Sequence, residues 1–241
     1  MKHEFTANQH ALLFGWIAKE VIIRCGEKGK EALKLGVIKY GKQRGRRMAE
    51  RVKADGFELS VPNYMAYGEW QAKPGDMDLR FAIQDKDLNM QAHKCPWYQE
   101  WKDNNLLEYA YIYCQYVDEA IVKGYNPNLK LDVPENRAEG APFCDFWFRN
   151  ANMTEKNFEY IKDTKEKLSG KAVMPWDYHI GHLYKTMEEV IVSKLKDKGK
   201  EAMKAAIDTF AKHFGQEAAD IVLSFRDTDF NKMPKYEGIA K

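Results

Sequence analysis

Apolar residues near both ends of the chain recur at helical spacing. In residues 7–25, Leu12, Ile17 and Val21 belong to this pattern, and Gly26 is expected to end the helix. Residues 29–53 predict a second helix directly afterwards, and residues 179–222 show the same texture. The pattern therefore predicts a pair of helices at each end of the chain.

The two helical pairs also share sequence. Shifted by 170 residues, the pentapeptide Lys28–Ala32 (KGKEA) is identical to Lys198–Ala202, and several flanking positions align. We interpret each segment as a helix, a short KGKEA turn and a second helix, so that residues 7–53 and 179–222 are copies of one αα-hairpin. Chance similarity between two amphipathic helices rich in Lys and Glu is the alternative.

Between the hairpins the apolar pattern changes to alternation, which is typical of β-strands. The alternating segments are residues 78–84, 88–95, 129–133 and 141–149. A short polar loop between the last two indicates an antiparallel hairpin. Residues 106–123 predict a buried helix, and residues 224–241 an extended tail. The predicted fold class is α+β: an antiparallel sheet flanked by two repeated αα-hairpins, in a single α+β domain (1–241) with residues 57–150 as its central part.

The composition mainly excludes classes of protein. The 241 residues include 38 Lys and Arg against 36 Asp and Glu, which argues against a dedicated nucleic-acid-binding or membrane-surface protein. No apolar run of about 18 residues predicts a membrane span. The first ten residues lack the apolar core of a secretory signal, so we expect a cytoplasmic protein whose four cysteines are reduced.

Three of the four cysteines lie in an aromatic-rich stretch, residues 88–148, where we expect any chemistry to occur. Cys114 and Asp118 are four positions apart on a predicted helix and share one of its faces. Cys144 shares a strand face with Phe146, and Cys95 shares one with His93. A thiolate can act as a nucleophile and a carboxylate as a general base. The predicted catalytic residues are Cys95, Cys114, Asp118, Cys144 and His93.

Aromatic and histidine side chains are expected to bind the substrate. The candidates are Trp97, Tyr111, Phe146, His179 and His182. The two histidines form an HxxH segment, for which a partly exposed helix start is the simpler interpretation. Packing in the core explains each cysteine equally well, and a solvated helix position explains Asp118 equally well. A zinc site built from three cysteines and His93 is a further alternative, although no CxxC chelate is present, and we expect neither a metal nor a cofactor.

A basic run lies in the second predicted helix. It comprises Lys42, Arg44, Arg46, Arg47, Arg51 and Lys53. Because no aromatic residues are interleaved, a solvated helix face explains it better than a nucleic-acid-binding surface does. The expected partner is a small-molecule substrate, and a homodimer built on the hairpins is left open.

Several short motifs follow one another in an order that is informative as a whole. They are Gly26–Gly29 with the Arg-rich helix, Cys95-Pro96, Cys114 with Asp118, Gly124–Pro127 (GYNP) and Cys144–Phe146 (CDF). In this order they resemble the L-2-amino-thiazoline-4-carboxylic acid hydrolase family, over roughly residues 10–225.

The resemblance implies a hydrolase that opens a C–N or C=N bond in a small cyclic substrate of thiazoline or amidine type. The namesake reaction opens thiazoline carboxylate to a carbamoyl-cysteine. A cysteine thiolate or an activated water would attack, with Cys144 or Cys114 preferred as the nucleophile. Two other functions are weighed beside this one: a non-catalytic small-molecule binding or sensing module with an aromatic, cysteine-lined pocket, and a helical-hairpin interaction protein without a ligand.

Overall fold

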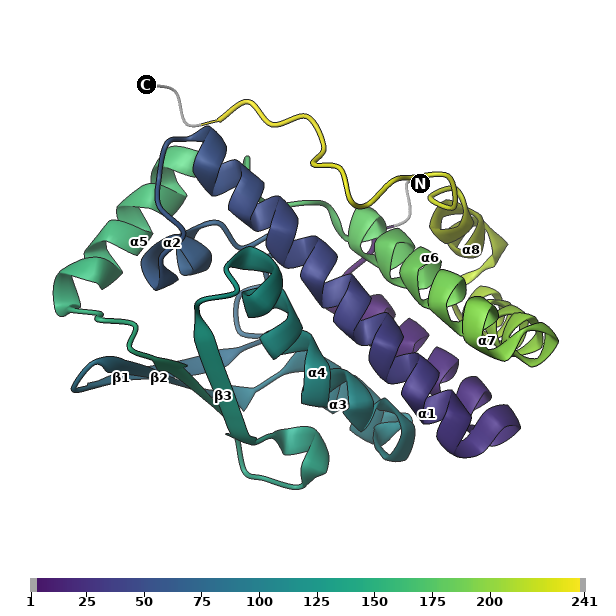
Figure 1. Cartoon of the computed structure of the whole chain (residues 1–241). Helices are drawn as coiled ribbons and strands as arrows, with labels where there is room; N and C mark the ends of the chain where they lie inside the picture. The colour runs from purple at the N-terminus through teal and green to yellow at the C-terminus, as the bar shows by residue number, and fades with distance from the viewer. Residues whose placement is uncertain (1–3, 239–241) are drawn as a thin grey trace. The chain divides into compact units, whose positions relative to one another are not determined.

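The computed structural model describes residues 4–238, which form eight α-helices and a four-stranded antiparallel sheet (Figure 1). The α+β prediction is confirmed. Contacts divide the chain into two compact units. The first comprises the residues up to Tyr40, Cys95–Val117 and Pro175–Thr228, and the second comprises Gly41–Lys94, Asp118–Met174 and the residues from Asp229 onward. Since each unit draws on three separate segments, the expectation of a single domain stays a prediction.

The first unit is helical. It contains the N-terminal part of α1 (Ala7–Ala54), α3 (Pro96–Asp103), the beginning of α4 (Leu107–Tyr125), α6 (Trp176–Leu195), α7 (Asp197–Phe214) and α8 (Gln216–Leu223). Helices α6, α7 and α8 pack against one another, and the yellow-green end of the chain in Figure 1 follows them in this order. Helices are thus present at both ends of the chain, as one broken helix, α1, at the beginning and as α6, α7 and α8 near the end.

The two helical pairs bend in the same way. Within α1 the helix breaks at Gly26 (φ 53°, ψ −132°), and Lys196 between α6 and α7 has nearly the same backbone angles (φ 54°, ψ −127°). Three residues later, a Cβ on Gly29 or on Gly199 would lie 2.7 Å from the carbonyl oxygen eight residues before it. The break therefore falls before the KGKEA segment, which begins the following helix, and the prediction of a KGKEA turn was wrong. The repeat itself stays an interpretation.

The second unit contains the sheet. Strands β1 (Asp78–Gln84), β2 (Asp87–Lys94), β4 (Cys144–Arg149) and β3 (Lys130–Glu135) lie in this order, and every neighbouring pair is antiparallel. The short 3-10 helix η1 (Arg137–Glu139) lies in the connection between β3 and β4. All four strands match segments predicted by alternation, but the order of strands in the sheet had not been predicted.

Two helices cover one face of this sheet. Tyr64 on α2 (Val61–Ala66) lies 5.7 Å, between ring centroids, from Phe148 on β4, and Phe158 on α5 (Glu155–Leu168) lies 5.7 Å from Phe81 on β1. Helices α2 and α5 also contact each other. Neither helix was predicted, because α2 is short and lies within residues 57–75, where the pattern is mixed, and α5 buries only three of its residues.

Within the second unit, α1 and α4 approach each other closely through glycines. A Cβ added to Gly45 would lie 2.0 Å from the Ile121 carbonyl oxygen, and one added to Gly124 would lie 2.4 Å from the Lys42 carbonyl oxygen. Only residues without a side chain allow this backbone contact. The close approach brings the end of α1, with its arginines, beside the second half of α4.

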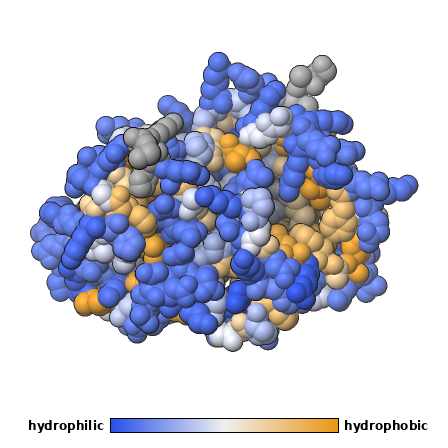
Figure 2. Space-filling model, turned by 180° about the vertical axis from the view of Figure 1, so that it is seen from behind, coloured by the Kyte–Doolittle hydropathy of each residue, from blue (hydrophilic) through white to orange (hydrophobic). Residues whose placement is uncertain are grey.

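The described part of the surface is mostly hydrophilic, with smaller hydrophobic areas between the polar side chains on the face drawn in Figure 2. Among the described residues, no helix is long and apolar enough to cross a membrane. After α8 no further helix or strand forms up to residue 238, as predicted for the tail, whose last residues lie outside the described range.

Candidate functional site

The first unit contains a buried cluster of histidine and aromatic side chains. Trp97 on α3 donates its indole N–H to Nδ1 of His10 at 3.0 Å, and Nε2 of His10 lies 2.9 Å from the Tyr40 hydroxyl. The exposed fraction is 1% for His10 and 0% for Tyr40. The ring of Tyr113 on α4 lies 5.9 Å from that of His10. One histidine therefore contacts side chains on three helices of this unit: α1, α3 and α4.

The hydrogen bonds of His10 define its tautomer. An indole N–H can only donate, so Nδ1 of His10 must accept from Trp97. The neutral ring then carries its proton on Nε2 and donates it to the Tyr40 oxygen. A doubly protonated ring would place two N–H groups against each other at Trp97. The arrangement favours neutral His10 in one orientation.

Three of the predicted substrate-binding residues belong to this cluster: Trp97, His179 and His182. The ring centroid of His182 lies 4.5 Å from that of Tyr40, and Trp176 lies 5.4 Å from His179. The exposed fractions of His179 and His182 are 1% and 0%. The interpretation as a partly exposed helix start was wrong, because this face of α6 packs against aromatic rings.

The other candidates of the first unit are half-buried. Cys114 and Tyr111 lie on α4. Cys95 is the extended residue (φ −149°, ψ 124°) that directly precedes α3. None of the chain's four cysteines, all within the described range, forms a disulfide. The structure places Cys95 and Cys114 in the same unit as the aromatic cluster, while Cys144 belongs to the second unit.

The second unit buries a carboxylate among arginines. Arg47 makes two hydrogen bonds to Glu69, from Nε and Nη2, each of 2.9 Å. Arg51 donates to the same carboxylate at 2.8 Å, and Nε of Arg44 lies 3.6 Å from it. Glu69 is 0% exposed, and the three arginines are between 0% and 4% exposed. The prediction of a solvated basic face was therefore wrong for these three residues, because a buried carboxylate pairs with them.

The charge of Glu69 is stabilised by these contacts. Burial by itself would raise the pKa of Glu69, but the charge and hydrogen bonds of Arg47, with the charges of Arg51 and Arg44, outweigh burial and lower the pKa to about 2. Arg47 also donates to the Phe230 carbonyl oxygen at 2.7 Å. This group of four side chains, the Glu69 cluster, thus ties α1 to the segment after α2 and to the tail.

Asp118 on α4 has the opposite electrostatic setting. Part of the residue is accessible, but protein surrounds its carboxyl group closely enough that burial raises the pKa of Asp118 to about 6, with the Arg44 guanidinium opposing the rise. Burial and the Asp118 charge also raise the pKa of Tyr64 well above its usual range. A carboxyl group with a pKa near neutrality can accept and return a proton under physiological conditions.

The remaining candidates lie on opposite faces of the sheet. Cys144 on β4 is opposite Ala92 on β2, and its sulfur accepts a hydrogen bond of 3.4 Å from the Arg137 N–H. Cys144 and Phe146 are buried on the face that α2 and α5 cover. His93 follows Ala92 and therefore points to the other face, where its ring lies 4.9 Å from that of Phe143. His93 cannot directly activate Cys144 in this arrangement.

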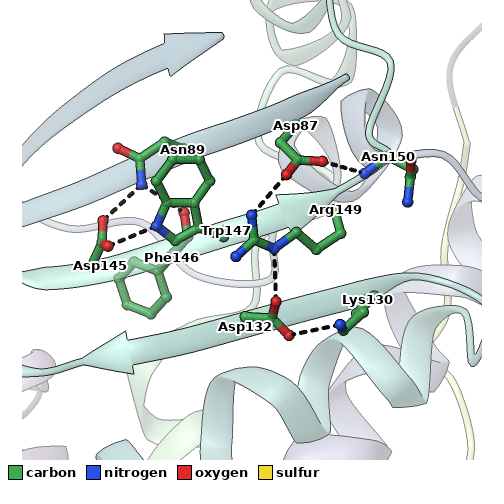
Figure 3. Close-up of polar contacts among 9 residues, drawn as sticks. All are labelled: Asp87, Asn89, Lys130, Asp132, Asp145, Phe146, Trp147, Arg149 and Asn150. Atoms are coloured by element: carbon green, nitrogen blue, oxygen red, sulfur yellow. Dashed lines mark hydrogen bonds and ion pairs between the residues drawn. The ribbon is translucent and has the colours of Figure 1, made fainter. Parts of the chain in front are cut away.

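The face of the sheet opposite α2 and α5 carries a polar network, which Figure 3 shows. Asp145 accepts from Asn89 and from the Trp147 indole, each at 2.7 Å. Arg149 bridges Asp87 at 2.8 Å and Asp132 at 2.7 Å. These contacts join β2, β4 and β3 across their backbone ladder. Because each carboxylate in the network pairs with a donor on a neighbouring position or strand, we interpret it as sheet stabilisation.

The described residues, 4–238, include no group of three or more His, Cys, Asp or Glu side chains arranged to hold a metal ion. The zinc alternative thus has no ligand set in that part of the chain.

Two sets of residues were not found from the sequence. The spacing of Arg44, Arg47 and Arg51 places them on one helix face, a signal that was available, but nothing in residues 57–75 marked Glu69 as their partner. His10 falls on the apolar face of its predicted helix, between Ala7 and Phe14, and that position was the available signal for the aromatic cluster.

Comparison with protein families gives one match. The model of the L-2-amino-thiazoline-4-carboxylic acid hydrolase family matches residues 6–148. Searches of curated proteins and of solved structures gave no significant match. The matched region contains Asp118, the Glu69 cluster and the three candidate cysteines, but it ends before His179 and His182. With more than half of its length matched, the chain belongs to the L-2-amino-thiazoline-4-carboxylic acid hydrolase family.

Proposed function

We propose that this protein hydrolyses a small cyclic thiazoline- or amidine-like substrate and that Asp118 is the general base. The observation that carries the proposal is the setting of Asp118. Its carboxyl group is desolvated, its pKa is raised to about 6, and the charge of Arg44 acts on it. Family membership supports the hydrolase class, since the family is named for a hydrolase.

The chemistry begins with a proton transfer to Asp118. The ionised carboxylate takes a proton from a water molecule or from a thiol, and the resulting nucleophile attacks the amidine-type carbon, which carries two nitrogens and, in a 2-amino-thiazoline, the ring sulfur as well. The bond from that carbon to the ring heteroatom then breaks, and the heteroatom takes up the proton. For a thiazoline opened to a carbamoyl product, the broken bond is carbon–sulfur, because the carbamoyl carbon keeps both nitrogens. A C–N bond breaks where the ring heteroatom is nitrogen.

Cys114 is the first candidate for a nucleophilic thiol. It lies one turn before Asp118 on α4, and side chains at this spacing share one helix face, with about 5–6 Å between their Cβ atoms. If Cys114 attacks, water must afterwards release the covalent intermediate, and Asp118 can activate that water as well. Cys95 and Cys144 are the alternatives, and Trp97, Tyr111, Phe146, His179 and His182 remain the proposed substrate-binding residues.

Arg44 has a defined role in this proposal. Its positive charge opposes the effect of burial on the pKa of Asp118 and so favours the ionised carboxylate near neutral pH. Glu69, paired with Arg47 and Arg51 on the same helix, fixes the direction of the arginine-bearing face. Arg44 is thus a positioning and charge-balancing residue.

The two kinked helical pairs are proposed to be copies of one hairpin that frames the rest of the chain. The matching backbone angles at Gly26 and Lys196, and the matching close approach at Gly29 and Gly199, support this interpretation. A cytoplasmic location stays an expectation from the sequence.

The function is tested with 2-amino-thiazoline-4-carboxylate by following the thiol that ring opening releases. For the wild type, log(kcat/KM) should rise with pH and level off above about pH 6, because Asp118 must be ionised to accept a proton. Asp118→Asn should lose about 10²–10⁴-fold in kcat. Glu119→Gln, which changes an exposed neighbour on the same helix, is the matched control and should leave kcat unchanged.

Single Cys→Ser variants at positions 95, 114 and 144 then show whether a thiol or a water molecule is the nucleophile, with Cys25→Ser as the control. Loss of turnover in one variant identifies the thiol, whereas full turnover in all three leaves water as the nucleophile. The proposal for Asp118 fails if Asp118→Asn retains the wild-type rate and pH profile. Binding of the substrate without any turnover by the wild type would support the binding-module alternative instead.

A further inference from the structure

We propose that strand β1 is the interface of a homodimer in which two copies of the chain join their sheets edge to edge. Strand β1 lies at one end of the sheet and pairs with β2 alone in the part of the chain that the structure describes. The N–H and C=O groups along the outer side of such a strand are available to another strand.

The two edges of the sheet differ in their protection. Strand β3 at the other edge carries Lys130 and Pro134, and both residue types discourage pairing with another chain. Strand β1 (DLRFAIQ) contains neither lysine nor proline. Its charges, Asp78 and Arg80, pair with each other at 3.0 Å. The β1 edge therefore lacks the lysine and the proline that protect β3, and the one irregularity in its pairing with β2 falls at its first residue, between Asp78 and Leu79.

The side chains of β1 are exposed as well. Leu79 is 39% and Phe81 is 44% exposed, although Phe81 already contacts Phe158 on α5. These are two of the four large hydrophobic residues with high exposure among the described residues. Leu79, Phe81 and Ile83 alternate along the strand and point to the face that α2 and α5 cover. A partner on this edge would cover them.

The sequence of β1 is self-complementary in the antiparallel direction. If Phe81 is placed opposite Phe81 of a second copy, all seven residues of the strand find partners, and Leu79 lies opposite Ile83. In this register Arg80 faces Ala82 and Asp78 faces Gln84, so that no like charges meet. A two-fold axis through Phe81 gives both copies the same surface, as a closed dimer requires. The occupant that best fits this edge is thus a second copy of the chain.

The oligomeric state tests this proposal. Light scattering on the purified full-length protein should give twice the 28.0 kDa mass of one chain. Phe81→Lys places a charge on the two-fold axis and should give the mass of one chain, with an unchanged circular dichroism spectrum. Ile23→Lys removes a more exposed hydrophobic side chain (61%) from α1 and should leave the dimer intact.

The register is tested by cross-linking under mild oxidation, with the wild type as the background. Phe81→Cys should form a disulfide between copies, because directly opposite residues have Cα atoms about 4.5–5.5 Å apart, within reach of a disulfide. Arg80→Cys should not, because its two copies lie on the diagonal, beyond that reach. The proposal is overturned if the wild type has the mass of one chain, if Phe81→Lys remains dimeric, or if Arg80→Cys cross-links as readily as Phe81→Cys.

Discussion

Replacing Asp118 with asparagine should stabilise the protein while removing its activity. The pKa of Asp118 is raised from 3.8 to about 6 by burial, so the folded protein binds this proton more tightly than the unfolded chain does. The contribution of this carboxyl group to the free energy of unfolding is therefore fully present below about pH 4 and is lost as the pH rises through 6. The shift of about two units corresponds to about 3 kcal/mol, and partial access of water to the residue reduces the expected effect to about 1–3 kcal/mol.

Urea unfolding of the wild type and of Asp118→Asn at pH 4 and at pH 8 measures this effect. The free energy of unfolding of Asp118→Asn minus that of the wild type is determined at each pH. Because asparagine differs from a protonated aspartate by an amount that does not depend on pH, the two values are compared with each other. The value at pH 8 should exceed the value at pH 4 by about 1–3 kcal/mol. Glu119→Gln on the same helix should show no such shift. If the stability difference is equal at both pH values, the carboxyl group is not desolvated and the basis for its role as a general base is lost.

Two further predictions concern the frame around this residue. Glu69→Gln leaves Arg47 buried without its carboxylate and should lower the free energy of unfolding at pH 7 by about 3–5 kcal/mol, as measured in urea. A loss below about 1 kcal/mol would contradict the assignment of a buried ion cluster. Lys196 has a positive φ that glycine tolerates far better, so Lys196→Gly should gain about 1 kcal/mol and raise Tm by about 2–4 °C. The reverse exchange, Gly26→Lys, should destabilise, and equal melting temperatures for all three proteins would refute the strain argument.

Local patterns predicted the elements with strong periodicity. Alternation located all four strands, and Gly26 marked the break in α1, because side-chain periodicity and the freedom of glycine act within a few residues. The same patterns missed α5, whose polar residues dominate its sequence, and could not give the strand order, which depends on pairing across long separations. The break at Lys196 could not be located from the sequence, since lysine, unlike glycine, does not indicate a positive φ.

The site was only partly predictable for the same reason. Asp118 was identified as a carboxylate on a helix face, but its raised pKa depends on burial in the folded chain, and the charge that opposes the rise comes from Arg44 on another helix, α1. The arginine run was visible in the sequence, yet its meaning changed once Glu69, 18 residues beyond Arg51, was found between the guanidinium groups. Long-range pairing thus converted an apparently solvated face into a buried one.

The division of the chain into two units has a practical consequence for comparing and recombining members of this family. The family match ends at residue 148, whereas the first unit needs Pro175–Thr228, which brings His182 against Tyr40. A fragment limited to the matched region would omit that segment and would therefore lack part of the first unit. A chimaera that exchanges the first unit between relatives must transfer three segments together: the residues up to 40, 95–117 and 175–228. Two of the junctions of such an exchange fall inside helices, at residue 40 in α1 and at residue 117 in α4, so the relatives chosen must continue each helix across its junction.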